Sequence, residues 1–318
     1  MTPWLCVLSV LEEGKVGLDI LSGCRIDAHV SSEPSSSSAS VEKPSGGKSV
    51  RRRISTRQRI AVASWRPPGD GRIYTRTTVD ATETLAYIEQ MRARTGEHLT
   101  VTHVVGAALA RALMVVPEVQ ARVVFGRTRY FDSCDIGFAV DVHDGTDLAP
   151  VKVQHVDQLT PLEVARQLVP GAARLRAGAD PAHSRSSSIV RQLPWWALRP
   201  VFHTASLLVG GLGVPAFGQP AFPLGVAFVS NVGTLGLDEA FLAPLPLART
   251  PIYLAVGAVR DAPVVVDGSV VVRPQLVLVA TGDHRIVDGA QAGRITTVLR
   301  ELLAEPARLD TPWQPSPS

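Results

Sequence analysis

Hydrophobic and polar positions along this chain repeat with two periods, one typical of helices and one typical of strands. Apolar residues at helical spacing predict helices, over residues 51–65, 82–94, 101–116, 161–169 and 290–303. Runs rich in β-branched and aromatic residues predict strands, over 72–79, 119–125, 128–131, 136–142, 149–153, 225–230, 252–259, 264–266, 270–272 and 275–281. Early helices followed by many strands with short turns favour an α+β sandwich in which helices cover a mixed sheet.

Several segments have a composition that predicts their packing. Residues 275–281 (QLVLVAT) are almost entirely apolar, as in a central strand that is buried on both faces. Pro170 and Gly171 are expected to end or kink the helix that begins at residue 161. Residues 193–217 hold three prolines and three glycines, which predicts short helical pieces and turns rather than one long helix.

The same patterns divide the chain into regions. Residues 31–50 form a Ser/Pro/Gly-rich linker, in which Ala39 and Val41 are the apolar residues before position 50. The segment 1–30 is too short for a strong core of its own. We expect one domain over 51–310, interrupted by an insertion at about 178–222, and a flexible tail over 311–318.

Composition and charge narrow the class of protein. With 45% hydrophobic and 19% charged residues among 318, the chain is typical of a packed globular protein. Its net charge is +3, and the basic residues are scattered, so no nucleic-acid surface is predicted. Cys6, Cys24 and Cys134 match no metal-ligand spacing, which favours a reducing, cytoplasmic location and argues against a zinc site.

A membrane role is not predicted either. The N-terminus lacks the basic region and cleavage site of a secretory signal. The uncharged stretch 200–218 contains four glycines and two prolines, a poor composition for a spanning helix. Its apolar side chains favour packing on its own domain or on another subunit over a membrane-surface element.

The candidate chemistry follows the buried strand directly. His284 comes just after residues 275–281, and Asp288 and Gly289 stand where the last helix is expected to begin. A strand end fixes the backbone of a base, a glycine permits a tight entry into a helix, and a helix N-terminus favours an acidic residue. A core histidine followed by an N-capping aspartate explains the same spacing, so the pattern alone leaves both interpretations open.

The wider sequence resembles a known family. Residues 283–290 (DHRIVDGA) resemble the catalytic signature of dihydrolipoamide acyltransferases, the core subunits of 2-oxoacid dehydrogenase complexes. Further similarity covers about residues 50–310 and includes ISTRQRIA, DIGFAVDVHDGTDLAPVKV and FVSNVGTLGLDEAF. The resemblance implies a trimeric, chloramphenicol acetyltransferase-like two-layer sandwich.

The resemblance also implies roles for individual residues. His284 would take the proton of a thiol, because the thiolate is the nucleophile. Ser230 would donate to the oxyanion of the intermediate across a subunit interface, although it also fits a polar residue at a strand end. Asp288 completes this candidate catalytic set through a structural ion pair, for which Arg57 is the matching position and Arg53 and Arg59 are alternatives. Asn231 and Gly289 would shape the surroundings of the site.

The implied activity is acyl transfer between coenzyme A and dihydrolipoyl-lysine, without a metal. The sequence shows no lipoyl domain, so the lipoyl group is expected in trans, on a carrier or another 2-oxoacid dehydrogenase component. Residues 12–30 partly match a peripheral-subunit-binding domain but lack its Gly-Thr-Gly loop. The expected assembly is a homotrimer or a larger cage. A structural scaffold with little activity, and a transferase with a small-molecule acceptor, are the alternatives.

Overall fold

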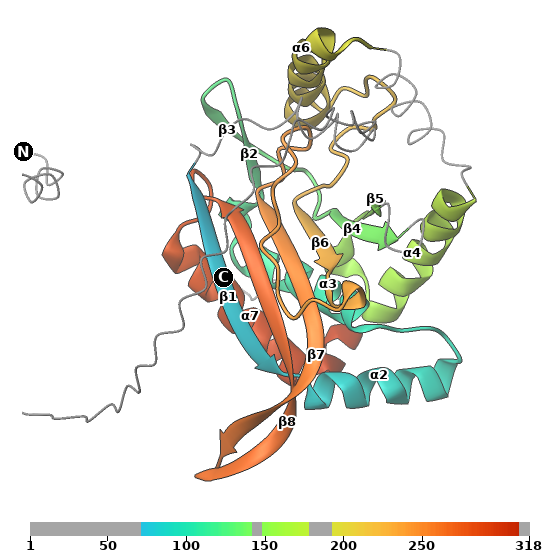
Figure 1. The fold of residues 1–318 in the computed structure, drawn as a ribbon, viewed down its shortest axis with the longest axis vertical. Helices are drawn as coiled ribbons and strands as arrows, with labels where there is room; N and C mark the ends of the chain where they lie inside the picture. The colour runs from blue at the N-terminus through green and yellow to red at the C-terminus, as the bar shows by residue number, and fades with distance from the viewer. Residues whose placement is uncertain (1–70, 142–147, 178–192, 312–318) are drawn as a thin grey trace, which may run out of the picture. The chain divides into compact units, whose positions relative to one another are not determined.

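The computed structural model describes residues 71–141, 148–177 and 193–311 (Figure 1). The predicted helix at 51–65, Arg57 and its alternatives Arg53 and Arg59, and the segments 1–30 and 31–50 lie outside the described residues. None of the helices in the described part of the chain is long and apolar enough to cross a membrane.

The domain is built on a six-stranded mixed sheet. Its strands, in spatial order, are β1 (Arg72–Asp80), β8 (Ser269–Asp283), β7 (Ile252–Val266), β6 (Ala227–Asn231), β4 (Ile136–Asp141) and β5 (Leu148–Val153). Strand β6 is parallel to both of its neighbours, and the other pairs are antiparallel. Consequently β6 and β7 begin at the end of the sheet where β8 ends, and this end carries residue 284.

A short hairpin stands beside the main sheet. It consists of β2 (Ala121–Val124) and β3 (Arg127–Tyr130), which pair only with each other among the described strands. Phe125 and Gly126 connect them with φ angles of 51° and 72°. Two consecutive residues at positive φ are typical of the tight turns that match the twist of a hairpin.

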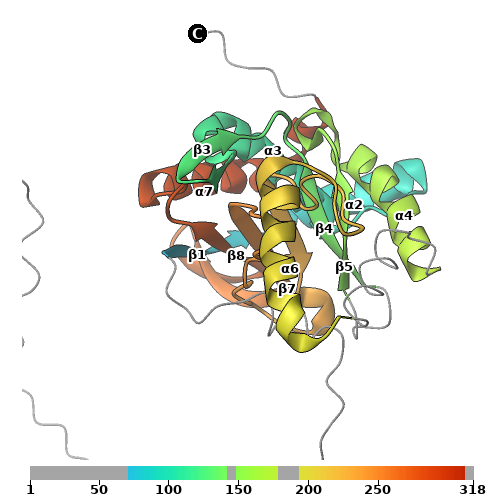
Figure 2. The same cartoon turned by 90° about the horizontal axis from the view of Figure 1, so that it is seen from above.

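Helices cover one face of the sheet, as the hydrophobic pattern predicts. They are α2 (Thr82–Thr95), α3 (Val101–Val115), α4 (Pro161–Arg176) and α7 (Gly289–Ala304). Every residue of α3 from Val104 to Leu113 is buried, so this helix forms the centre of the core. Figure 2 shows α7 and α3 on the same side of the strands. The predicted α+β architecture, with helices against a mixed sheet, is confirmed.

The opposite face of the sheet is covered by irregular chain. Tyr253 packs with Leu245 and Ala248, and Val279 packs with Leu242, all in or against the segment that joins β6 to β7. Leu278 instead belongs to the core under the helices. Strand β8 is therefore buried on both faces, as its apolar sequence predicts, although it is second from the edge of the sheet.

Two predicted pairs of short strands are single long strands. Segments 252–259 and 264–266 form the continuous β7, and segments 270–272 and 275–281 form the continuous β8. Pairing resumes after an irregularity between Val256 and Val259 and runs to a turn at Asp267 and Gly268. Pro263, Pro274 and Asp261 interrupt the alternation of apolar and polar residues in the sequence. All three lie in a two-stranded ribbon, in which the backbone pairing of β7 with β8 continues through them.

The helix that begins at residue 161 does not end at Pro170. Helix α4 continues to Arg176 with Pro170 inside it. A proline there removes one helical hydrogen bond. Burial of Ala172 and Leu175 beyond the proline offsets that loss, and Gly171 lets the helix approach Val151, whose Cγ1 lies 2.6 Å from where a Cβ would stand.

The insertion contains a longer helical run than predicted. Helix α6 (Trp195–Ala205) includes Pro200 and passes directly into η3 (Ser206–Leu212), a π-helical turn that ends at Gly213. The expectation of short broken pieces was therefore wrong for this stretch. Inside η3, a Cβ on Gly210 would collide with the carbonyl of Leu247, so the glycine permits close backbone contact.

This contact predicts that alanine substitutions at Gly210 and at Gly211 change the stability of the protein by different amounts. We expect Gly210→Ala to lower the free energy of unfolding by about 1–3 kcal/mol, because the backbone of Leu247 cannot give way as a side chain would. Gly211→Ala is the matched control, since its Cβ would meet Leu207 at 3.5 Å, an ordinary contact. Thermal unfolding of both variants measures the difference. Equal midpoints would contradict the packing of the insertion described above.

Candidate active site

The backbone around His284 is fixed by both neighbouring strands. The N–H of His284 donates to the carbonyl of Gly71, just before β1, at 3.2 Å. The N–H of Asp283 donates to the carbonyl of Pro251, just before β7, at 2.9 Å. The side chain of His284 is exposed at this end of the sheet. The structure therefore presents an accessible imidazole on a rigid turn.

One hydrogen bond determines which nitrogen of His284 can act as a base. Its Nδ1 lies 2.9 Å from the carbonyl oxygen of Val287. A carbonyl oxygen only accepts, so Nδ1 carries the proton in this contact. In the neutral ring Nε2 is then the unprotonated nitrogen. The local geometry orients His284 with Nε2 as its free proton acceptor.

The neighbouring charges do not pair with His284. Asp283 accepts hydrogen bonds from Arg285, whose Nε and Nη2 lie 2.8 Å and 2.5 Å from its two carboxylate oxygens. This two-point contact holds the carboxylate against the guanidinium. The pair is close in sequence to His284 but leaves Nε2 without a carboxylate partner among the described residues.

Asp288 lies at the N-terminus of α7. Its Oδ1 accepts from the N–H of Gln291 at 2.8 Å, and Gln291 Oε1 accepts from the N–H of Asp288 at 2.9 Å. This is a capping box, which satisfies two backbone donors at the helix start. Among the described residues Asp288 makes no ion pair. A Cβ on Gly289 would meet nothing within 4 Å, so no described contact there requires a glycine.

Ser230 and Asn231 lie near the end of β6. Ser230 is 6% exposed and shares a face with Ala255, under the irregular segment that covers the sheet. Asn231 donates from Nδ2 to Thr102 Oγ1 at 2.8 Å, and its Oδ1 accepts from the N–H of Thr234 at 3.3 Å. Asn231 therefore ties the turn after Ser230 to the start of α3.

Within one chain His284 and Ser230 do not meet. The sheet register aligns Ser230 with Ala255 and then with Val279, two strands away. His284 follows Val279 by five positions, past the end of β8. With a rise of about 3.3 Å per residue and about 4.8 Å between strands, the two residues are roughly 15–20 Å apart. Contact between these two side chains would require a second copy of the chain.

The start of α3 contains a residue that the sequence interpretation missed. His103 accepts from the N–H of Thr100 through Nδ1 at 3.1 Å, and Thr100 precedes the helix as its N-cap. Burial, with a smaller effect from His98 and Arg92, lowers the pKa of His103 to about 4, so its ring is neutral at pH 7. A threonine followed three positions later by a hydrogen-bonding side chain is the signal that could have identified this cap.

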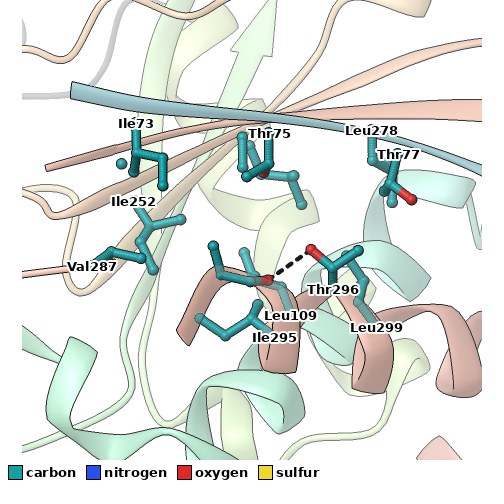
Figure 3. A pocket seen from close by; sticks show the side chains of 14 residues that line it. Ile73, Thr75, Thr77, Leu109, Ile252, Leu278, Val287, Ile295, Thr296 and Leu299 are labelled. Atoms are coloured by element: carbon teal, nitrogen blue, oxygen red, sulfur yellow. Dashed lines mark hydrogen bonds between the residues drawn. The ribbon is translucent and has the colours of Figure 1, made fainter. Parts of the chain in front are cut away.

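A cavity lies beside the candidate site, but its described lining contains no acid, base or nucleophile of the kind proposed for the site. It measures about 40 Å³ and lies between α7 and the strands β1, β7 and β8, with Val287 in its wall (Figure 3). Its polar side chains are Thr75, Thr77 and Thr296, of which Thr77 accepts from Arg300 and Thr296 donates to the carbonyl of Ala292. None of the described residues that line it is titratable. We interpret it as a packing gap in the core.

Comparison with known proteins identifies the family. The family model described as "2-oxoacid dehydrogenases acyltransferase (catalytic domain)" matches residues 68–186 and 224–310. The chain belongs to this family. The resemblance seen in the sequence is thereby confirmed. The unmatched stretch 187–223 contains α6 and η3 of this acyltransferase-family domain, so these two elements have no counterpart in the family model.

A curated relative supports the assignment. The acetyltransferase component (dihydrolipoyllysine-residue) of the pyruvate dehydrogenase complex of Mycoplasma capricolum is 26% identical over 237 residues, which are 72% of this chain and 44% of the relative. The chain spans less than half the length of the curated relatives that it matches.

Solved structures establish the fold. A probable dihydrolipoamide acetyltransferase of Listeria monocytogenes has a TM-score of 0.59 at 18% identity, with 83% of this chain and 95% of that chain covered. The dihydrolipoamide acetyltransferase of Azotobacter vinelandii has a TM-score of 0.56 at 22% identity, with 76% and 84% covered. The acyltransferase-family domain therefore shares the fold of these proteins.

Proposed function

We propose that this domain transfers an acyl group between coenzyme A and a thiol acceptor such as dihydrolipoyl-lysine on another protein. The observation that carries the proposal is the exposed His284, whose Nδ1 donates to Val287 and whose Nε2 is free to take a proton. The family match and the activity named for the Mycoplasma capricolum relative support the same reaction.

The proposed reaction uses His284 as both base and acid. Nε2 removes the proton of the attacking thiol, and the resulting thiolate adds to the carbonyl carbon of the thioester. The tetrahedral intermediate then collapses, the bond to the leaving sulfur breaks, and Nε2 returns the proton to that sulfur. No charge or atom is left over. The Val287 carbonyl stabilises the positively charged ring between the two proton transfers.

Ser230 completes the proposed site from a neighbouring subunit. An oxyanion needs a fixed donor, and the Ser230 hydroxyl makes no hydrogen bond within the described part of the chain. Because the sheet register separates it from His284 of the same chain, we propose a homotrimer in which each site uses both residues from adjacent subunits. The investigation of the Azotobacter vinelandii enzyme concerned a serine, a histidine and an asparagine four positions later. Here Asp288 is four positions after His284.

Asp288 is proposed as a positioning residue. Its capping of α7 fixes the backbone that follows Val287, and the carbonyl of Val287 orients the His284 ring. The ion pair between Asp288 and Arg57 remains part of the proposal, since Arg57 lies outside the described residues.

A direct assay tests this function. The full chain, incubated with acetyl-CoA or succinyl-CoA and free dihydrolipoamide, should form the acyl-dihydrolipoamide with release of coenzyme A, at roughly 1–10³ turnovers per second. Absence of turnover in a folded, oligomeric protein would instead favour the scaffold alternative. Transfer to an acceptor without a dithiol, in place of dihydrolipoamide, would favour the small-molecule alternative.

A further inference from the structure

A second pocket lies where the insertion meets the β2–β3 hairpin. Its volume is about 560 Å³, and we call it the arginine pocket. Its lining consists of Arg122, Val124, Phe125, Arg127, Arg129, Gly211 and Leu212. Three positive charges around one hollow make it a candidate anion site.

Arg122 is held in place by groups from both sides of the arginine pocket. Its guanidinium lies 4.2 Å from the ring centre of Phe222 and 4.8 Å from that of Phe131. Its Nε donates to the carbonyl of Gly211 at 2.9 Å, and its Nη1 donates to the carbonyl of Tyr130 at 2.8 Å. A guanidinium has five N–H donors, so these two bonds leave others for a ligand. Arg122 is thus pre-oriented.

The remaining charges around Arg122 favour an anion. Burial lowers the pKa of Arg122, Asp132 acts in the opposite direction, and the positive charge of Arg129 adds to the lowering. Arg127 and Arg129 are exposed and make no ion pair or hydrogen bond within the described part of the chain. Among the described residues, Asp132 is the acidic group that acts on Arg122, and the three arginines of the lining outnumber it.

Apolar side chains flank these charges. Phe125 at the hairpin turn is 75% exposed, and Leu212 of η3 is 49% exposed. Exposed apolar side chains beside the arginines favour a ligand that carries both an anionic group and an aromatic or apolar part.

The arginine pocket lies at the end of the sheet that carries His284. Figure 1 shows β2, β3 and α6 at the end where β1 begins and β8 ends. Arg249 links these parts, because it donates to the carbonyl of Val123 at 3.0 Å and to Ser206 Oγ at 3.1 Å. Two residues later, the carbonyl of Pro251 accepts from the N–H of Asp283, the residue before His284.

The insertion supplies one wall of the arginine pocket. Gly211, Leu212 and Phe222 all lie in the stretch 187–223 that the family model does not match. The family model therefore does not cover the part of the wall that Gly211, Leu212 and Phe222 supply, whereas Tyr130 and Phe131 lie in the matched stretch 68–186.

We propose that the arginine pocket binds a phosphate-bearing ligand with an aromatic or apolar body. Planar guanidinium groups pair with phosphate oxygens through two parallel hydrogen bonds, and a group with two negative charges can use several of them at once. Two sources have this chemistry: the nucleotide end of the coenzyme A substrate, and a separate phosphorylated ligand. The first source rests on the proposed function, whereas the second does not.

Calorimetric titration of the full chain tests the binding. The probes are coenzyme A, dephospho-coenzyme A, adenosine 3′,5′-bisphosphate and pyrophosphate. The Arg127→Gln/Arg129→Gln double variant should bind the phosphorylated probes about ten- to hundredfold more weakly, as expected for the loss of charge-assisted hydrogen bonds. Arg174→Gln/Arg199→Gln is the matched control, since both residues are exposed arginines on helices. Circular dichroism checks that both double variants are folded.

Kinetics distinguishes the two sources. If the nucleotide end of coenzyme A is the ligand, the double variant raises KM for acetyl-CoA by a similar factor with kcat unchanged, while acetyl-pantetheine, which lacks the nucleotide, reacts as in the wild type. An unchanged KM together with weakened binding of another phosphorylated probe assigns the pocket to a separate ligand.

The outcome that overturns the proposal is specific. If the wild type binds none of the probes, or the Arg127/Arg129 variant binds them as tightly as the wild type, the arginine pocket is not a phosphate site. A chain without acyltransferase activity that still binds phosphate through these arginines would disprove the proposed function and leave this inference standing.

Discussion

Replacing His284 with alanine should reduce acyl transfer by about two to four orders of magnitude, the usual contribution of a positioned general acid–base group. The variant loses the nitrogen that accepts the thiol proton, and the neighbouring carboxylate in the described part of the chain, Asp283, is held by Arg285. Steady-state turnover with acetyl-CoA and dihydrolipoamide measures the loss. The fall should appear in kcat, since the side chain acts on the reacting sulfur rather than on distant parts of the substrate.

The fold should survive this substitution. The described contact of the ring is a single hydrogen bond to Val287 at an exposed position, and a bond of this kind contributes about 0.5–1.5 kcal/mol. His98→Ala provides a control, because His98 is also exposed but lies before α3. If His284→Ala retains turnover close to that of the wild type, His284 is not the base.

Much of the fold could be predicted because hydrophobic periodicity and burial agree along most of the chain. The period of α3 and the β-branched run of β1 each match the observed element within a residue or two. In both segments the residues that prefer the local conformation are also those that the core buries. The conformation that the local sequence favours is then also the one that tertiary packing favours.

The predicted ends of helices and strands were wrong at prolines that lie inside longer elements. Pro170 and Pro200 lie inside helices, and Pro263 lies inside β7. Each removes a backbone donor, a loss that packing further along the element can offset. Burial of Leu175 beyond Pro170 is one such compensation. Such contacts depend on segments distant in sequence, so the local pattern does not contain them.

Some features of the candidate site could be predicted from the sequence, and others depend on the three-dimensional structure. The position of His284 after a buried strand is visible in the sequence. The contact between Nδ1 and the Val287 carbonyl is not, because it depends on the conformation of the turn. The separation of His284 from Ser230 depends on strand direction, since β6 and β7 are parallel and β8 is antiparallel to them. Topology, rather than any motif, therefore leads to the requirement for a second subunit.

That requirement predicts complementation between two inactive variants. Ser230→Ala alone should lower kcat by about 10²–10³, as for loss of an oxyanion donor. Coexpressed with His284→Ala, it should regain activity, because an interface can take His284 from one variant and Ser230 from the other. In a cyclic trimer with random mixing, about three quarters of trimers are mixed and each has one intact site of three, so about a quarter of wild-type activity is expected.

Control experiments show whether recovered activity comes from sites shared between subunits. Purified single variants combined without exchange of subunits should remain inactive, and a chain carrying both substitutions, coexpressed with either single variant, should form no intact site. Light scattering should give a mass of three chains or a multiple of three. Full activity in a monomer, or no recovery in mixed trimers confirmed by differential tags, would contradict a site shared between subunits. The 15–20 Å separation of the two residues within one chain, estimated from strand geometry, would then exclude Ser230 from the reaction.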